Sequence, residues 1–203
     1  MNQTTTRRGF LAASAAAAVA FAGCSGGSSA DPEEIDDGNR PVIGAEDAPV
    51  TVTVFEDFAC PSCRQFKTQI TPAIVQRYVE PGDVRYLHAD FPIPVDETWS
   101  YAVGGAARAV FEEGGNDAFW DFSTSIYDFQ SSYSLEAIEE VAEEVAGLGE
   151  TAREAAESER YRDHLESDRE LGESWGVSGT PTVFVNDEQA DLDEIGAEIE
   201  DRL

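Results

Sequence analysis

The feature that most constrains this chain is a pair of cysteines three positions apart, Cys60 and Cys63, which enclose Pro61 and Ser62. The pair directly follows an apolar, strand-like run at residues 50–55. At the start of a helix, one turn brings two such cysteines within the roughly 4.4–6.8 Å between Cα atoms that a disulfide tolerates. The helix start also offers unpaired N–H groups and a positive dipole end, which favour thiolate at Cys60. The pattern therefore predicts a redox-active dithiol at a strand-to-helix junction.

A single pair of cysteines at this spacing has two other possible interpretations. The first is half of a zinc site, which usually needs a second such pair or two closely spaced histidines. The two histidines, His88 and His164, lie far apart and lack that spacing. We therefore expect no metal site, and we expect both histidines to be surface or hydrogen-bonded groups. The second interpretation is a structural disulfide, although closing so short a loop restricts the unfolded chain little.

The first 40 residues have the composition of an export signal and a linker. Arg7 and Arg8 precede an Ala-rich apolar run at 11–22, which is too short for a permanent membrane helix of about 20 residues. Small residues then precede Cys24, as at the processing site of secreted lipoproteins, although Phe21 stands where leucine is usual. We expect a twin-arginine lipoprotein-type signal peptide at 1–23 and a flexible acidic tether at 24–40.

This N-terminal pattern predicts a location outside the cytoplasm. A lipid on Cys24 would anchor the protein to the outer face of the cell membrane. The alternative is cleavage with Cys24 left as a spare thiol, which would give a secreted protein.

The composition is strongly acidic, with 41 Asp and Glu against 13 Lys and Arg and a formal net charge of −28. Such a surface argues against nucleic acid as a partner, because nucleic-acid binding needs a basic footprint. The carboxylates are spread through every predicted helix, which indicates general solvation at high salt, where self-repulsion is screened. We expect a halophilic, haloarchaeal source, and the charge carries no information about the substrate.

The hydrophobic pattern predicts one small α/β domain at residues 41–203. A strand at 50–55, a helix from the cysteine pair to about 79 and a strand at 84–88 form its first half. Residues 99–175 are predicted to be helical, and the chain returns to a strand at 182–185 before a last short helix. Because the two β-rich ends must meet to cover the first strand, we expect the helical block at about 98–175 to be an insertion.

A second motif, Gly-Val-Ser-Gly-Thr-Pro-Thr at 176–182, lies just before the returning strand. Together with Cys-Pro-Ser-Cys at 60–63 and Asp-Phe-Pro at 90–92, it resembles the DsbA-like branch of the thioredoxin superfamily over roughly residues 42–203. The resemblance implies a thioredoxin-like fold with a helical insertion subdomain. It also implies thiol–disulfide oxidoreductase activity without a dissociable cofactor.

The resemblance assigns roles to four residues. Cys60 matches the exposed nucleophilic cysteine and Cys63 the buried resolving one. Pro181 matches a proline whose peptide bond from Thr180 is cis and lies against the active site. A cis bond there presents backbone polar groups of Thr180 to the dithiol, where an extended substrate can pair with them. The alternative for Pro181 is a proline that merely begins a strand.

Pro61 and Ser62 should set the redox balance of the pair. Strong oxidases of the family often have histidine at the position of Ser62. Serine can donate a hydrogen bond but supplies no cation, so we expect a less oxidising protein. Arg64 and Lys67 follow on the same helix. Because they face different sides, at most one of them is well placed to assist the thiolate.

Val54 is a second departure from the family pattern. Many relatives have a buried glutamate at this position, which transfers a proton to and from the resolving thiol. Glu56, on the same strand face as Val54 by alternation, or Asp57, nearer the motif, is a candidate substitute. The favoured interpretation is that both are solvated carboxylates at a strand end.

Three functional hypotheses follow. The first is a dithiol oxidase that introduces disulfides into exported proteins and is reset by a membrane redox partner. The second is a reductase or isomerase in the same compartment. The third is a non-enzymatic anchored binding protein whose cysteine pair is structural or metal-bound.

Overall fold

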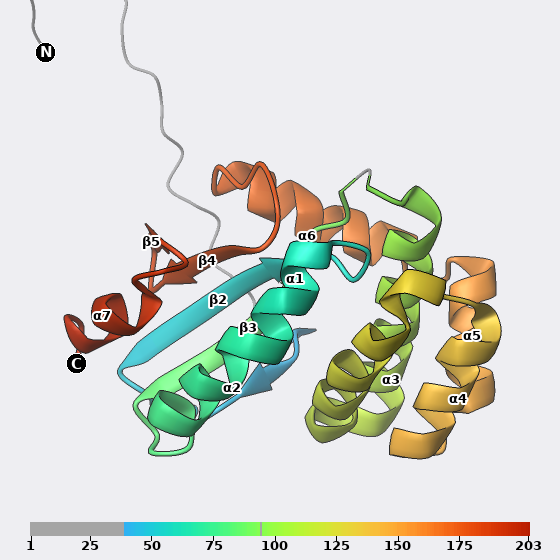
Figure 1. The fold of residues 1–203 in the computed structure, drawn as a ribbon, viewed down its shortest axis with the longest axis horizontal. Coiled ribbons are helices and arrows are strands. Elements are labelled where there is room, and N and C mark those ends of the chain that lie inside the picture. Colours follow the sequence, from blue (N-terminus) through green and yellow to red (C-terminus); the bar gives the residue numbers. More distant parts are fainter. Residues whose placement is uncertain (1–38, 94) are drawn as a thin grey trace, which may run out of the picture.

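The computed structural model describes residues 39–93 and 95–203 (Figure 1). The predicted signal peptide, Cys24 and nearly all of the predicted tether therefore lie outside the described residues. Within them, no helix is both long and apolar enough to cross a membrane. The last two tether positions pack against the fold, because Arg40 pairs with Asp168 at 2.6 Å and Asn39 accepts hydrogen bonds from Arg108.

A mixed five-stranded sheet forms the centre of the domain, in the order β1-β3-β2-β4-β5. Strands β2 and β3 are parallel, in register from Val50 opposite Val84 to Glu56 opposite Asp90, whereas β4 is antiparallel to β2. The central strand is thus covered by segments from both ends of the chain, as predicted. The strands are β1 (Val42–Ile43), β2 (Val50–Glu56), β3 (Val84–Asp90), β4 (Thr182–Val185) and β5 (Glu188–Ala190).

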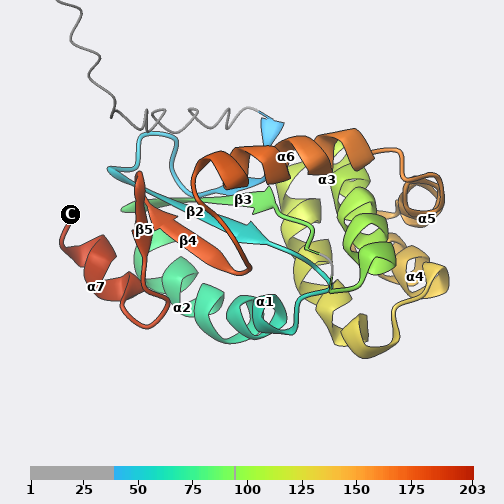
Figure 2. The ribbon, with the colours of Figure 1, turned by 90° about the horizontal axis from the view of Figure 1, so that it is seen from above.

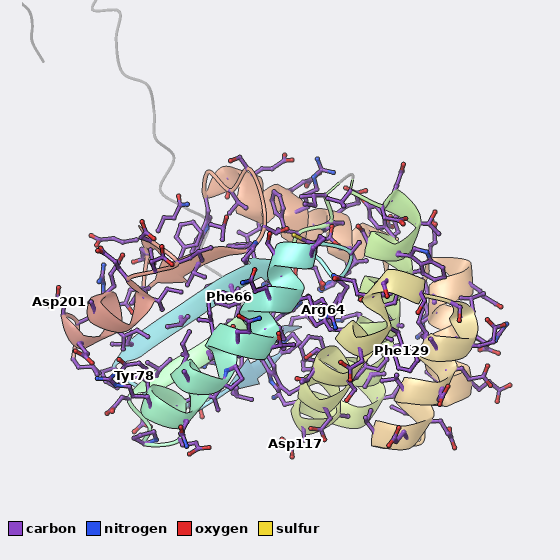
Figure 3. All side chains as sticks on the ribbon, in the orientation of Figure 1. Arg64, Phe66, Tyr78, Asp117, Phe129 and Asp201 are labelled. Atoms are coloured by element: carbon purple, nitrogen blue, oxygen red, sulfur yellow. The ribbon has the colours of Figure 1, made fainter. Side chains whose placement is uncertain are left out.

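Helices cover both faces of this sheet (Figure 2). One face carries α1 (Pro61–Gln65), η2 (Phe66–Ile70), α2 (Thr71–Ile74), η3 (Val75–Val79) and, at the C-terminus, α7 (Ile195–Glu200). The other face is covered by α6 (Arg162–Ser174). Strand alternation gives each face its own core, because Val54 packs with Phe66 and Tyr78 whereas Phe55 packs with Phe184. Figure 3 labels Phe66 and Tyr78 on the helical stretch that follows the cysteine pair.

Pro72 lies within the helical stretch that begins at the cysteine pair. Proline has no N–H, and its ring crowds the carbonyl four residues earlier. The preceding turn is widened to a π-helix, in which the Thr71 N–H donates to the Phe66 carbonyl five residues back. The stretch therefore continues to Val79, and Cys63 and Lys67 both lie on its buried side.

The predicted helical insertion is a bundle beside the sheet. It consists of α3 (Glu97–Ser125), the 3₁₀ segment η4 (Ile126–Ser132), α4 (Leu135–Ala146) and α5 (Gly149–Ser158), after which α6 returns the chain to the sheet. Ser134 caps α4 through a hydrogen bond from the Ala137 N–H. The core of the bundle includes the buried side chains of Phe119, Phe122 and Ile138, and it is continuous with Phe58 and Cys63 of the sheet domain.

Candidate active site

The cysteine pair lies where β2 ends and α1 begins. Cys60 is the N-cap residue of α1, with extended backbone angles, and Pro61 occupies the first helical turn. Both cysteines are free thiols in this structure. Cys63 is fully buried, and Cys60 is only 5% exposed. The expectation of an exposed Cys60 is therefore wrong for this structure, because the Thr180 carbonyl oxygen lies 3.4 Å from the Cys60 sulfur.

The two thiols have opposite acidities. A hydrogen bond from the Cys63 thiol, helped by the backbone N–H groups of Ser62 and Cys63, outweighs burial and lowers the pKa of Cys60 to about 5. Burial, together with the same thiol–thiol hydrogen bond, raises the pKa of Cys63 far above its ordinary value. At pH 7 a group with a pKa of about 5 is roughly 99% ionised. The arrangement therefore presents one thiolate, Cys60, backed by a neutral thiol.

The Thr180–Pro181 peptide bond is cis, as the resemblance implied. The loop places the Thr180 carbonyl against the dithiol, where Cys60 donates to it at 3.4 Å only while it is protonated as a thiol. Pro61 and Ser62 are exposed on the outer side of the first turn of α1. Ser62 thus acts on Cys60 through its backbone N–H.

Asp57 holds the loop before the cysteines. Its carboxylate accepts hydrogen bonds at 2.8 Å from the Ala59 N–H, the Ile93 N–H and the Ser100 hydroxyl. Burial nevertheless raises the pKa of Asp57 to about 6. Its own N–H donates to the Cys63 sulfur at 3.5 Å. The expectation that Asp57 is a solvated carboxylate is therefore wrong.

Glu56 is also buried, with 1% of its surface exposed, which corrects the same expectation for this residue. It faces the α1 side of the sheet, as the alternation from Val54 predicted. One carboxylate oxygen lies 3.2 Å from Nδ1 of His88, whose Nε2 lies 3.3 Å from Asp90. The other oxygen is buried without a hydrogen-bond partner among the described residues. Burial opposes the charge of His88, but the hydrogen bonds of Asp90 and Glu56 raise its pKa to about 9.

Lys67 is the only lysine of the chain, and it lies buried one helical turn beyond Cys63. Its ammonium group stands 4.1 Å from the centre of the Trp120 ring of α3. Burial lowers the pKa of Lys67 to about 8, although the charges of Glu56 and Cys63 act to raise it. Arg64 is exposed, so only the buried Lys67 lies beneath the dithiol.

Two residues of the helical insertion, Gln130 and Tyr133, hold the active-site loop in place. The Gln130 amide donates to the carbonyls of Phe58 and Cys60, both at 2.9 Å, and the Tyr133 hydroxyl donates to Phe58 at 2.9 Å. Sequence reasoning missed this pair. Its only signal was a polar amide and a phenol at the junction of two predicted helices.

The described residues hold no group of three or more His, Cys, Asp or Glu that is arranged to bind a metal ion. The chemistry of the site rests on protein side chains: a stabilised thiolate, a buried thiol and a cluster of buried charges below them. Such a site can exchange disulfides through a mixed disulfide at Cys60.

A dithiol at a helix N-terminus, with a cis-proline loop against it and a thioredoxin-like sheet beneath it, defines a thiol–disulfide oxidoreductase. The family model described as Thioredoxin matches residues 36–201, and the chain belongs to this family. The Disulfide bond formation protein D of Bacillus subtilis is 32% identical over 174 residues, which cover 81% of this chain and 77% of that protein. The chain is therefore DsbA-like and an enzyme, rather than a non-enzymatic binding protein.

Solved structures agree with this assignment. Oxidised BdbD from Bacillus subtilis has a TM-score of 0.74 at 30% identity, covering 81% of this chain and 93% of that one. DsbA of Chlamydia trachomatis has a TM-score of 0.70 at 21% identity, covering 80% of this chain and 90% of that one. The second likeness shows the fold alone, including the helical insertion.

Proposed function

We propose that this protein is a dithiol oxidase that introduces disulfides into exported proteins through Cys60 and Cys63. The observation that carries the proposal is the lowered pKa of Cys60, to about 5. A stabilised thiolate favours the reduced form of the pair and so makes its disulfide the stronger oxidant. The name of the Bacillus subtilis relative, a disulfide bond formation protein, supports the same direction.

The reaction has two exchange steps. A substrate thiolate attacks the Cys60 sulfur of the Cys60–Cys63 disulfide, which gives a mixed disulfide and releases Cys63 as a thiolate that takes up a proton. The second substrate thiolate then attacks the substrate sulfur of the mixed disulfide, and Cys60 leaves as a thiolate. Two electrons pass from the substrate to the protein, and the substrate gains one disulfide. The low pKa of Cys60 favours the last step, because it is a good leaving group.

In this scheme Glu56 accepts the proton of Cys63 when the reduced pair is reoxidised. The charge of Glu56 raises the pKa of Cys63, and its second oxygen has no partner among the described residues. Asp57 is less suited, because both of its oxygens already accept hydrogen bonds from Ala59, Ile93 and Ser100. Glu56 would thus replace the glutamate that relatives place at Val54, from the same strand face.

A reductase or isomerase in the same compartment is the second candidate. Ser62 favours it, because its side chain is exposed and supplies no cation to the thiolate. Such an enzyme would work in reverse, with Cys60 attacking a substrate disulfide and Cys63 releasing the product.

The proposal places residues 41–203 outside the cytoplasm as the catalytic domain. Residues 1–23 would direct export, and a lipid on Cys24 would anchor the tether at 24–40 to the outer face of the membrane. A membrane redox partner would reoxidise the pair. Mass spectrometry of the mature N-terminus tests the anchor, and an unmodified Cys24 would remove it.

Trapping of the mixed disulfide tests the function. Oxidised protein is mixed with a reduced dithiol peptide, and one peptide disulfide should form per Cys60–Cys63 pair. Cys63→Ser, mixed with the same peptide in its disulfide form, should accumulate a mixed disulfide, because the Cys60 thiolate attacks the peptide disulfide, one peptide sulfur leaves as a thiolate and no Cys63 thiol is left to release the product. Cys60→Ser should form no mixed disulfide. Catalysis that survives in Cys60→Ser would exclude the proposed site.

A further inference from the structure

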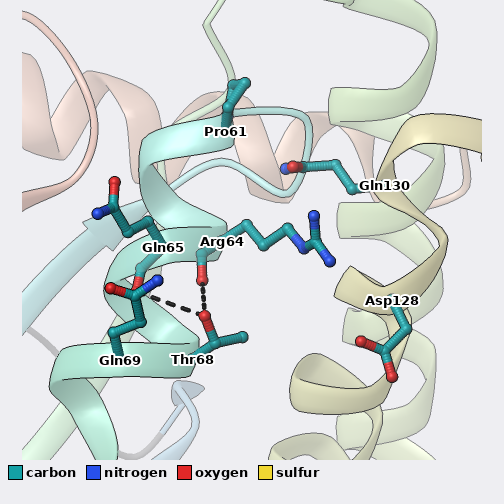
Figure 4. Close-up of a pocket in the computed structure, with 7 residues that line it drawn as sticks. All are labelled: Pro61, Arg64, Gln65, Thr68, Gln69, Asp128 and Gln130. Carbon is teal, nitrogen blue, oxygen red and sulfur yellow. Dashed lines mark hydrogen bonds between the residues drawn. The ribbon is translucent and has the colours of Figure 1, made fainter.

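A polar pocket of about 500 Å³ lies directly beside the active-site helix (Figure 4). It opens between α1 and η4, next to the cysteine pair: Pro61 follows Cys60, and the Gln130 amide donates to the Cys60 carbonyl. Its lining residues are Pro61, Arg64, Gln65, Thr68, Gln69, Asp128 and Gln130. The mouth of this pocket is therefore next to the residue at which a substrate would react.

Arg64 is the cation of this pocket. Its side chain extends from α1 across the gap toward η4, and the carboxylate of Asp128 points away from it (Figure 4). Among residues 39–93 and 95–203, Arg64 forms no ion pair. Carboxylates pair with most other exposed or partly exposed arginines, namely Arg77, Arg153, Arg162, Arg169 and Arg202. Arg160 also forms no ion pair among the described residues, but it packs on the Tyr161 ring rather than lining this pocket. An unpaired guanidinium in a chain with a net charge of −28 is a site for an anionic group from outside.

The polar groups next to Arg64 in the pocket are neutral, and some of them already form hydrogen bonds within the protein. The Thr68 hydroxyl donates to the Arg64 carbonyl at 2.8 Å, and the Gln130 amide nitrogen is used by the active-site loop. The Gln65 and Gln69 side chains are exposed at the pocket wall. A planar guanidinium matches a carboxylate through two parallel hydrogen bonds, and the amide groups of the wall can complete its contacts.

We propose that this pocket binds an acidic side chain of the substrate, a few residues from the cysteine that reacts with Cys60. The inference rests on the proposed function, because it names the substrate class of the same site. The Arg64 N–H donates to the Cys60 carbonyl at 3.2 Å, so the two residues are one helical turn apart, about 6 Å along the axis. An extended chain advances about 3.3 Å per residue, so this separation alone spans about two positions from the reacting cysteine. The length of the arginine side chain extends the range to about four positions.

The overall charge of the protein makes this contact selective. An acidic substrate approaching a surface of net charge −28 meets like charge over most of it. Arg64 offers attraction beside the dithiol, and a direct hydrogen-bonded contact is less screened by salt than the long-range repulsion. The pocket thereby orients an acidic segment with its cysteine at Cys60.

Two dithiol peptides test the proposal, identical except for glutamates or glutamines two to four positions from the reacting cysteine. The ratio of kcat/KM for the acidic over the neutral peptide is measured with wild type, Arg64→Gln and the matched control Arg160→Gln. Arg160 is an exposed arginine that packs on the Tyr161 ring, so the control removes the same charge elsewhere. Arg64→Gln should lower the ratio about two- to five-fold, the range of an exposed ion pair.

The control should leave the ratio unchanged. Asp128→Asn should raise the ratio, because it removes a negative charge at the pocket wall that repels an acidic peptide. Using the ratio cancels any effect of Arg64 on the Cys60 thiolate, which would change both peptides alike. Equal ratios in wild type and Arg64→Gln would overturn the inference.

Binding of a cysteine-free acidic peptide, followed by NMR, separates the inference from the proposed function. If wild type exchanges disulfides with neither dithiol peptide but binds the cysteine-free peptide in an Arg64-dependent way, the proposed function fails and the pocket assignment stands. If wild type exchanges disulfides but the cysteine-free peptide shifts no resonance of Arg64, Gln65 or Gln130, the pocket assignment fails.

Discussion

Replacement of His88 by glutamine should remove a pH-dependent part of the stability of this fold. The imidazole is buried between Glu56 at 3.2 Å and Asp90 at 3.3 Å. Burial opposes its charge, but the hydrogen bonds of the two carboxylates prevail and raise its pKa to about 9. At neutral pH the site is thus an imidazolium between two buried carboxylates, and glutamine retains hydrogen bonding without the charge.

The magnitude follows from the rise of the His88 pKa from 6.5 to about 9. At about 1.4 kcal/mol per pH unit, this rise corresponds to about 3 kcal/mol of folding free energy. The folded state binds the proton more tightly than the unfolded state. The contribution is therefore fully present below pH 6.5 and is lost as the pH rises through 9. Burial lowers the pKa of Lys67 to about 8. Above pH 8 this residue therefore makes the free energy of unfolding rise with pH, and it does so equally in wild type and in His88→Gln.

Denaturant unfolding of wild type and His88→Gln, at constant salt and from below pH 6.5 to above pH 9, measures this difference. Wild type should be more stable than the variant by about 3 kcal/mol at the acidic end, and the gap should close at the alkaline end. His164→Gln, the matched control at the other histidine, should retain the wild-type dependence. A gap between wild type and His88→Gln that stays constant over this window would refute the charged state of His88.

Three further predictions concern the site. The thiolate absorbance of the reduced protein should titrate near pH 5, and its midpoint should move to higher pH in Cys63→Ala, because the Cys63 thiol is the main cause of the low pKa of Cys60. An unchanged midpoint in Cys63→Ala would show that the Cys63 hydrogen bond does not lower this pKa. Glu56→Gln should slow reoxidation at least tenfold in stopped-flow measurements, while Asp57→Asn should not, and equal rates would exclude Glu56 as the proton acceptor. Tyr133→Phe should lower the free energy of unfolding by about 1 kcal/mol, because the hydrogen bond to the Phe58 carbonyl is lost. An unchanged free energy of unfolding in denaturant would show that Tyr133 does not hold the active-site loop in place.

The dithiol and the cis-proline loop could be predicted because each is a local motif. Cys60 and Cys63 lie on one turn of a helix, so their proximity follows from spacing alone. The cis bond before Pro181 came from the family pattern rather than from physical chemistry. The insertion followed from the order of β- and α-type segments, because only one arrangement lets the two β-rich ends meet around the first strand.

The buried charges could not be predicted from the sequence. In so acidic a chain a carboxylate at a strand end is most simply solvated, and the burial of Glu56 depends on His88, which is distant in sequence. The hydrogen bonds by which Gln130 and Tyr133 hold the active-site loop depend on how the helical insertion packs against that loop. The carbonyls that accept them lie 70 or more positions away in the sequence. Contacts of this kind are set by tertiary packing, which leaves no periodic signal in the chain.

The reduction potential of the Cys60–Cys63 pair tests the proposed direction of electron flow most directly. Relative to a thiol of pKa about 7, as in thioredoxin, a pKa of about 5 stabilises the reduced form at pH 7 by about 2 kcal/mol, or about 50 mV. Equilibration with glutathione at pH 7 should therefore give a potential near about −220 mV, above the roughly −270 mV of thioredoxin. A value at or below about −270 mV would contradict a dithiol oxidase and indicate a reductase.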